Sequence, residues 1–157
     1  MQETECVELE ADTLYSDKQL ALLDGRRVPE HIAIIMDGNR RWATRQGLPA
    51  FQGHRQGAKQ LDIVVKAAME LGIQTLTVFA FSTENWKRTE KEVTALMHLL
   101  KNQLWAQKER MRQEGIKLSF IGDIKGMPRH VRKVMREVMN YASAGENFEL
   151  IIALNYG

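Results

Sequence analysis

Short apolar segments alternate with longer amphipathic segments along residues 31–157, and this alternation constrains the fold more than any other feature of the sequence. The apolar segments are rich in β-branched residues and cover 31–36, 75–81, 117–121 and 148–153. Such composition favours strands. The first two are apolar almost throughout, which predicts strands buried on both faces of a parallel sheet. Because helical segments separate the strands, we expect an α/β fold with a central parallel sheet covered by helices.

The segments between these strands have helical periodicity. Residues 57–71 carry apolar side chains three and four positions apart, and Gly72 ends that pattern. A longer stripe begins at Val93 and ends before Gly115, and a third begins at Pro128, a residue that suits the first position of a helix. We expect all three stripes to pack in the core rather than to bind a cofactor.

The first thirty residues differ in character from the rest of the chain. Residues 1–30 are predicted to form a polar amino-terminal arm with a short helix that begins after Ser16 and stops at Gly25. Residues 31–157 are predicted to form one α/β domain. Cys6 is the only cysteine, so an internal disulfide is excluded and a reducing compartment is expected.

The charge balance narrows the classes of partner. Lys and Arg number 22 against 20 Asp and Glu, and this near balance does not predict nucleic-acid binding. The acidic start is unlike a signal peptide, and no apolar run approaches the ~20 residues that span a bilayer. We therefore expect a cytoplasmic protein whose contact with membranes, if it has any, is peripheral.

A glycine-containing turn from Asp37 to Asn39 follows the first strand and leads into a helix expected over residues 40–46. In open α/β sheets, ligands bind beyond the carboxyl ends of the strands. Gly38 leaves room for a ligand near the backbone, and the N–H groups at a helix start attract anions. The turn therefore predicts a phosphate site. The alternative, in which Asp37 and Asn39 form only a turn or a cap, remains open at this point.

Arginines and one carboxylate give this turn its charge. Arg40, Arg41 and Arg45 carry guanidinium groups that match phosphate oxygens. A carboxylate at Asp37 would repel phosphate unless a divalent cation joins the two. Mg²⁺ is commonly held by one or two carboxylates and by substrate phosphates, so Asp37 is predicted to be a magnesium ligand.

A second polar loop, residues 82–89, follows the second strand at the same edge of the predicted sheet. Asn85 can hydrogen-bond a hydroxyl or a phosphate, and Arg88 can contact phosphate. The alternative is a solvated loop with Trp86 folded onto the surface. Residues 53–57 are expected to open the second helix and to bring His54 toward the same anion, although a capping or packing histidine is equally consistent with the sequence.

These segments resemble the motifs of one family, the cis-prenyltransferases, of which undecaprenyl diphosphate synthase is the bacterial example. Residues 31–42 resemble H-x-A-x-I-M-D-G-N-x-R-W, and residues 53–57 resemble G-H-x-x-G. Residues 80–88 resemble A-F-S-x-E-N-W-x-R, and residues 155–157 match the start of N-Y-G-G-R. Four motifs in the same order make the resemblance specific.

The resemblance implies an activity and its requirements. Such enzymes add isopentenyl diphosphate units in cis to an allylic diphosphate, farnesyl diphosphate in bacteria, and make a polyprenyl diphosphate lipid carrier for the cell wall. The resemblance also implies Mg²⁺ as cofactor, a hydrophobic tunnel for the growing chain, a homodimer, and peripheral membrane contact through the lipid product.

The resemblance assigns roles to particular residues. Asp37 and Asn85 would be catalytic, with Asp37 serving the metal. A mobile loop carrying Asn85 would close over the reaction. The implied substrate-binding residues are Gly38, Asn39, Arg40, Arg41, Trp42, His54, Ser82, Trp86 and Arg88.

Two departures from the family pattern keep an alternative open. Ala50 replaces an arginine that the family usually has three residues before the glycine of its G-H motif. The sequence also stops at Gly157, before the family's carboxyl-terminal segment that binds isopentenyl diphosphate. The alternative is a non-catalytic or truncated cis-prenyltransferase-like subunit. A phosphohydrolase of the haloacid-dehalogenase type would need a second carboxylate where Asn39 stands.

Overall fold

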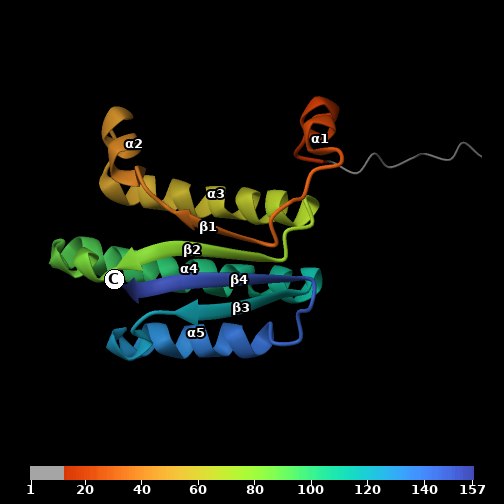
Figure 1. Cartoon of the computed structure of the whole chain (residues 1–157). Coiled ribbons are helices and arrows are strands. Elements are labelled where there is room, and N and C mark those ends of the chain that lie inside the picture. The colour runs from red at the N-terminus through yellow and green to blue at the C-terminus, as the bar shows by residue number, and fades with distance from the viewer. Residues whose placement is uncertain (1–12) are drawn as a thin grey trace, which may run out of the picture.

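The computed structural model describes residues 13–157, in which four strands form one parallel sheet (Figure 1). The order across the sheet is β1-β2-β4-β3, and all neighbouring pairs are parallel. The strands are β1 (His31–Ile35), β2 (Thr75–Ser82), β3 (Ile116–Ile121) and β4 (Phe148–Tyr156). The predicted α/β class is confirmed. Cys6 lies outside the described residues.

The helices connect these strands in the predicted alternation. They are α1 (Asp17–Leu23), α2 (Asn39–Arg45), α3 (Ala50–Glu70), α4 (Glu90–Glu114) and α5 (Arg129–Tyr141). Two short 3-10 helices, η1 (Thr83–Lys87) and η2 (Ile124–Gly126), follow β2 and β3. In Figure 1, α3 and α4 lie behind the strands, and α5 runs alongside β3. Within residues 13–157, no helix combines the length and the apolar character needed to cross a membrane.

The core forms where α3 and α4 pack on one face of the sheet. Leu76 and Val78 of β2 and Leu150 of β4 are buried on that face. Val65 of α3 and Leu104 of α4 belong to the same cluster. The apolar stripes predicted from the sequence therefore do pack in the core.

The prediction that β1 is buried on both faces is wrong. Exposure alternates along β1, and Ile35 is 75% exposed. Among the described residues β1 is an edge strand paired with β2, and neither α3 nor α4 covers the other face of the sheet. That face is lined partly by polar contacts, such as His31 Nε2 at 2.7 Å from Thr77 Oγ1.

The amino-terminal arm joins the domain through α3. Ser16 caps α1 as predicted, because its Oγ accepts a hydrogen bond from the Gln19 N–H at 3.3 Å. The Tyr15 hydroxyl donates to the carbonyl of Ala67 at 3.0 Å, and this contact attaches the arm to α3.

Two predicted helix starts need correction. The helix that was expected to open at residues 53–57 is α3, and it begins at Ala50, seven residues before Gly57. Residues 53–57 therefore lie inside α3 and not at its start. Pro128 is the residue before α5 rather than its first residue. The glycines of α3 looked like a helix boundary in the sequence, but they serve packing. A Cβ at Gly53 would lie 1.9 Å from the carbonyl oxygen of Asn39 in α2.

A Gly53→Ala variant tests this packing. In an ordinary helix interior, Gly→Ala would stabilise the protein by about 1 kcal/mol. Here the new methyl group would overlap backbone of α2, so we expect a loss of about 1–3 kcal/mol. Urea denaturation measures the difference, with the exposed α3 variant Gln60→Ala as control. A Gly53→Ala variant more stable than the wild type would contradict the close contact.

Candidate active site

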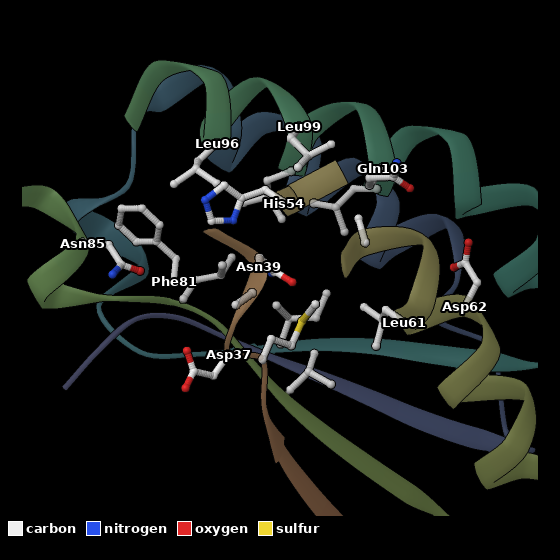
Figure 2. A pocket seen from close by; sticks show the side chains of 18 of the residues that line it. Asp37, Asn39, His54, Leu61, Asp62, Phe81, Asn85, Leu96, Leu99 and Gln103 are labelled. Atoms are coloured by element: carbon white, nitrogen blue, oxygen red, sulfur yellow. The ribbon is translucent and has the colours of Figure 1, made fainter. Parts of the chain in front are cut away.

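A pocket of about 760 Å³ lies between the sheet, α3 and α4. Its mouth is polar and is formed by the turn after β1 together with residues from η1 and α3, as Figure 2 shows for Asp37, Asn85 and His54. Its walls are largely apolar and include Leu61 of α3 and Leu96 of α4. The pocket thus combines a polar mouth with an apolar interior, which suits a ligand with a charged head and a hydrocarbon tail.

The turn after β1 holds Asp37 in a fixed arrangement. Asp37 Oδ1 accepts a hydrogen bond from the Gly38 N–H at 2.6 Å, and Oδ2 accepts one from Arg41 Nη2 at 3.0 Å. Gly38 has a φ of 88°, in the left-handed region that glycine adopts without strain. The Arg41 hydrogen bond, followed by the Gly38 N–H, holds the pKa of Asp37 below its usual value. Asp37 is therefore an ionised and exposed carboxylate at neutral pH.

Glu92, near the start of α4, connects three of the predicted ligand residues. Its Oε1 accepts a hydrogen bond from Arg88 Nη1 at 3.0 Å and lies 3.6 Å from His54 Nε2 and 3.7 Å from Arg40 Nε. Sequence reasoning did not single out Glu92. The available signal was its place four residues after Arg88 at the start of a helix, a spacing at which opposite charges meet.

His54 is held among these charges with little contact with solvent. Its side chain is 12% exposed, and Nε2 lies 3.3 Å from Arg88 Nη1. Burial, followed by the charge of Arg88, lowers the pKa of His54, while Glu92 acts in the opposite direction. The imidazole is therefore neutral at neutral pH and can accept or donate a hydrogen bond at the mouth.

An irregularity in β2 shapes the wall of the pocket below the mouth. The register of β2 against β4 shifts between Phe79 and Phe81. In a regular strand these two rings would point to the same face of the sheet. Phe79 instead packs edge-on against Tyr156, with ring centroids 5.5 Å apart, whereas Phe81 is buried and lines the pocket.

The loop after β2 is braced by contacts within the protein. Asn85 Oδ1 accepts a hydrogen bond from the Ser82 N–H at 3.0 Å. Trp86 packs on Phe81 with ring centroids 4.9 Å apart, and its Nε1 donates to Asn155 Oδ1 at 2.7 Å. Asn155 also donates from Nδ2 to a carbonyl beyond β3, so it links the carboxyl ends of two strands to η1.

Most of the predicted site residues meet at the pocket. Those that line it are Asp37, Gly38, Asn39, Arg40, Arg41, His54, Asn85 and Arg88, together with Arg45. Trp42, Ser82 and Trp86 are not among the lining residues. Their role in substrate binding stays a prediction, and the contacts of Ser82 and Trp86 are those of a braced loop.

The donor set at the mouth fits a magnesium ion that shares its ligands with a substrate. Residues 13–157 contain no group of three or more His, Cys, Asp or Glu side chains placed to hold a metal ion. Asp37 offers one ionised, exposed carboxylate beside several cationic side chains. Mg²⁺ keeps waters and needs only one or two carboxylates when substrate phosphates complete its shell.

Fold and site together define an α/β protein with a group of phosphate-compatible side chains at the mouth of an apolar pocket. The family model described as undecaprenyl diphosphate synthase matches residues 35–157, and the chain belongs to this cis-prenyltransferase family.

Relatives and solved structures agree with this membership. The isoprenyl transferase of Thermotoga maritima is 46% identical over 131 residues, which are 83% of this chain and 56% of that protein. The isoprenyl transferase of Clostridium perfringens is 42% identical over 141 residues, 90% of this chain and 56% of that protein. A crystal structure of lavandulyl diphosphate synthase from Lavandula x intermedia, in complex with dimethylallyl diphosphate, superimposes with a TM-score of 0.78 at 31% identity. The superposition covers 82% of this chain and 55% of the lavandulyl diphosphate synthase chain. The chain therefore spans about half the length of these relatives.

The lowered pKa of His54 gives a prediction about pH. The folded protein resists protonation of His54, whereas the unfolded chain takes up that proton near the ordinary pKa of about 6.5. Stability should therefore fall as the pH drops below about 6.5, and the fall should end below the folded-state pKa. NMR titration of the His54 ring should give a midpoint below 6.5. Urea denaturation between neutral and mildly acidic pH should show a smaller loss for His54→Gln. A His54 midpoint above 6.5 would mean that Glu92 outweighs burial.

Proposed function

We propose that this chain forms the allylic-diphosphate half of a prenyltransferase that adds isopentenyl diphosphate units in cis to an allylic diphosphate. The observation that carries the proposal is that Asp37, Arg41, His54 and Arg88 all line one end of a largely apolar pocket. We further propose farnesyl diphosphate as the allylic substrate and a polyprenyl diphosphate, the undecaprenyl carrier lipid of the cell wall, as the product.

The mouth would bind the diphosphate head. Arg40 and Arg88 both face the carboxylate of Glu92, and Arg41 faces that of Asp37, so each guanidinium is already directed toward an anionic group. A diphosphate entering the mouth would share these guanidinium groups with the two carboxylates. The apolar walls would take the isoprenoid tail, which gains free energy by leaving water.

The proposed reaction requires the residues at the mouth of the pocket to stabilise the departing diphosphate. As the diphosphate departs from the allylic carbon, negative charge grows on its oxygens, and the fixed arginines stabilise that charge. When bound, Mg²⁺ would supply further positive charge to the same oxygens, with Asp37 as its protein ligand. Neutral His54 and the Asn85 amide would hydrogen-bond the head, and the apolar walls would keep water from the carbon centre.

The remaining assignments extend the same proposal. Trp42, Ser82 and Trp86 would contact substrate when the η1 loop closes over the site. Isopentenyl diphosphate is the second substrate, the assembly is a homodimer, and contact with membranes is peripheral and follows from the lipid product. These assignments derive from the cis-prenyltransferase motifs and from membership of the family. No observation favours the non-catalytic alternative over this function.

Titration of the chain with farnesyl diphosphate and Mg²⁺, followed by calorimetry, tests the allylic site. We expect saturable binding that Arg41→Ala weakens roughly 10- to 100-fold, the range for losing a hydrogen bond to a charged group. Arg136→Ala, on the exposed side of α5, serves as the matched control and should bind like the wild type. Equal affinity of the wild type and Arg41→Ala would refute the assigned head-group site. A folded wild-type chain that binds no farnesyl diphosphate would bring the non-catalytic alternative forward.

Steady-state turnover in a protein that contains both substrate halves tests the role of Asp37. Replacing Asp37 with Ala removes the carboxylate proposed to hold Mg²⁺, and we expect turnover to fall by orders of magnitude. Circular dichroism should show an unchanged fold, because the Asp37 side chain is exposed. If the variant turned over at close to the wild-type rate, Asp37 would have no essential role in metal binding.

A further inference from the structure

A stripe of basic side chains runs along the outer face of α5. Arg129, Arg132, Lys133 and Arg136 are spaced three and four residues apart, so they share one face of the helix. The apolar side chains of α5 are buried on the opposite face, which directs the stripe away from the core. Figure 1 shows α5 at one edge of the described fold, beyond β3. The stripe is therefore open to a partner from solution.

Most of the charge on this stripe is not neutralised within the protein. Among residues 13–157, its three arginines form no ion pair, and Lys133 has one, with Glu137 at 4.0 Å. The mouth of the pocket differs, because arginines there face carboxylates. The whole chain has a formal net charge of +2, yet residues 129–141 contain four Lys or Arg side chains and a single acidic one. Such a local excess of positive charge attracts an anionic partner.

Aromatic and basic side chains lie beside the stripe, on the flank of α4 that faces α5. Trp105 is 49% exposed, and Lys108 Nζ lies 3.6 Å from the centroid of its ring. Tyr141 of α5 joins this group, since its ring centroid lies 5.1 Å from Lys108 Nζ and 4.9 Å from Arg112 Cζ. Its hydroxyl donates a hydrogen bond to the carboxylate of Glu109. We refer to this aromatic group together with the basic stripe as the α4–α5 surface.

The combination of side chains on this surface indicates what kind of anion it fits. An exposed tryptophan alone needs no explanation. Trp and Tyr rings are enriched where membranes meet water, because one part of each ring is apolar and another is polar. Clusters of Lys and Arg bind the anionic headgroups of phospholipids. A cation already lies over each ring, which disfavours the stacking on bases by which aromatic side chains bind single-stranded nucleic acid.

We propose that the α4–α5 surface docks this protein on membranes that contain anionic phospholipids. Trp105, Lys108 and Arg112 are not among the residues that line the pocket, so the surface is separate from the substrate site. The proposal rests on the proposed function only for its expectation of peripheral membrane contact, because headgroup binding at this surface needs no prenyl diphosphate. It assigns the membrane contact to side chains of the protein itself and not to the lipid product alone.

Sedimentation of the chain with phospholipid vesicles tests the basic stripe. We expect binding to phosphatidylcholine vesicles that contain roughly one third phosphatidylglycerol, and no binding to phosphatidylcholine alone. Binding should weaken as salt is added, because salt screens exposed charges. Each Lys or Arg near an anionic membrane strengthens binding roughly fivefold. The triple variant Arg129→Gln, Lys133→Gln and Arg136→Gln should therefore bind about 100-fold more weakly.

A matched control separates the position of the charges from their number. The variant Arg26→Gln, Arg27→Gln and Lys59→Gln removes three positive charges from exposed positions outside α4 and α5. It should bind the anionic vesicles like the wild type. Equal losses in the control and in the α5 variant would mean that net charge alone causes binding, and the proposal would be overturned.

Tryptophan fluorescence separates a membrane from other polyanions. Vesicles with brominated acyl chains quench a tryptophan that enters the bilayer interface. We expect quenching in the wild type that Trp105→Phe largely removes, although Trp42 and Trp86 remain in α2 and η1. Quenching that persists in Trp105→Phe overturns the assigned surface. A DNA duplex that binds as tightly as the anionic vesicles, with no quenching by the vesicles, would replace the membrane by nucleic acid as the partner.

The titration with farnesyl diphosphate described above keeps this proposal distinct from the proposed function. A wild-type chain that binds farnesyl diphosphate but no anionic vesicle overturns the docking surface and leaves the proposed function intact. Vesicle binding that the α5 variant loses, in a chain that binds no farnesyl diphosphate, supports the docking surface and refutes the proposed function. If the α5 variant does not fold, quenching in Trp105→Phe gives the decision.

Discussion

The contact between the start of α2 and the middle of α3 is the constraint on which the site depends. A Cβ at Gly53 would lie 1.9 Å from the Asn39 carbonyl oxygen, and one at Gly57 would lie 2.6 Å from the Asn39 side-chain amide. The two helices approach this closely because glycine occupies both positions. Asp37 comes two residues before this contact, and His54 stands between the two glycines. One packing contact therefore sets the position of the turn after β1 relative to α3, and with it the shape of the mouth.

The arrangement of charged side chains at the mouth follows from the position of the turn after β1 relative to α3. Asp37 is paired with Arg41, and Glu92 with Arg88, so guanidinium groups and carboxylates already face one another before any ligand arrives. Pairing of this kind restricts the arginine side chains, which lowers the entropy lost when an anion binds. It also lowers net affinity, because an entering anion must share its cations with carboxylates. A site that binds and releases charged ligands repeatedly benefits from both effects.

The sequence predicted those parts of the structure that depend on local pattern. Alternating strands and helices, the cap at Ser16, and the charged turn at Asp37 follow from neighbours in the chain. What the sequence did not predict depends on contacts between distant segments. The exposure of Ile35 is decided by which face of the sheet the helices cover, and the role of Gly53 by the approach of α2. Glu92 resembles any charged residue at a helix start until the fold brings His54 beside it.

The irregularity in β2 has a consequence for how this protein can change. Phe79 and Phe81 are two residues apart yet lie on different sides of the sheet, because the register against β4 shifts between them. At the carboxyl end of β2, a side chain can be replaced by another that fits the same face of the sheet, but the number of residues cannot change. The register shifts a second time between Phe81 and Ser82, and Ser82 pairs with Tyr156 at the same offset that holds up to Phe79. Removing one residue between Phe79 and η1 would therefore move Ser82 and η1 out of register with β4. Variation in this part of the protein should therefore occur by substitution, while insertions and deletions are confined to segments away from the carboxyl end of β2.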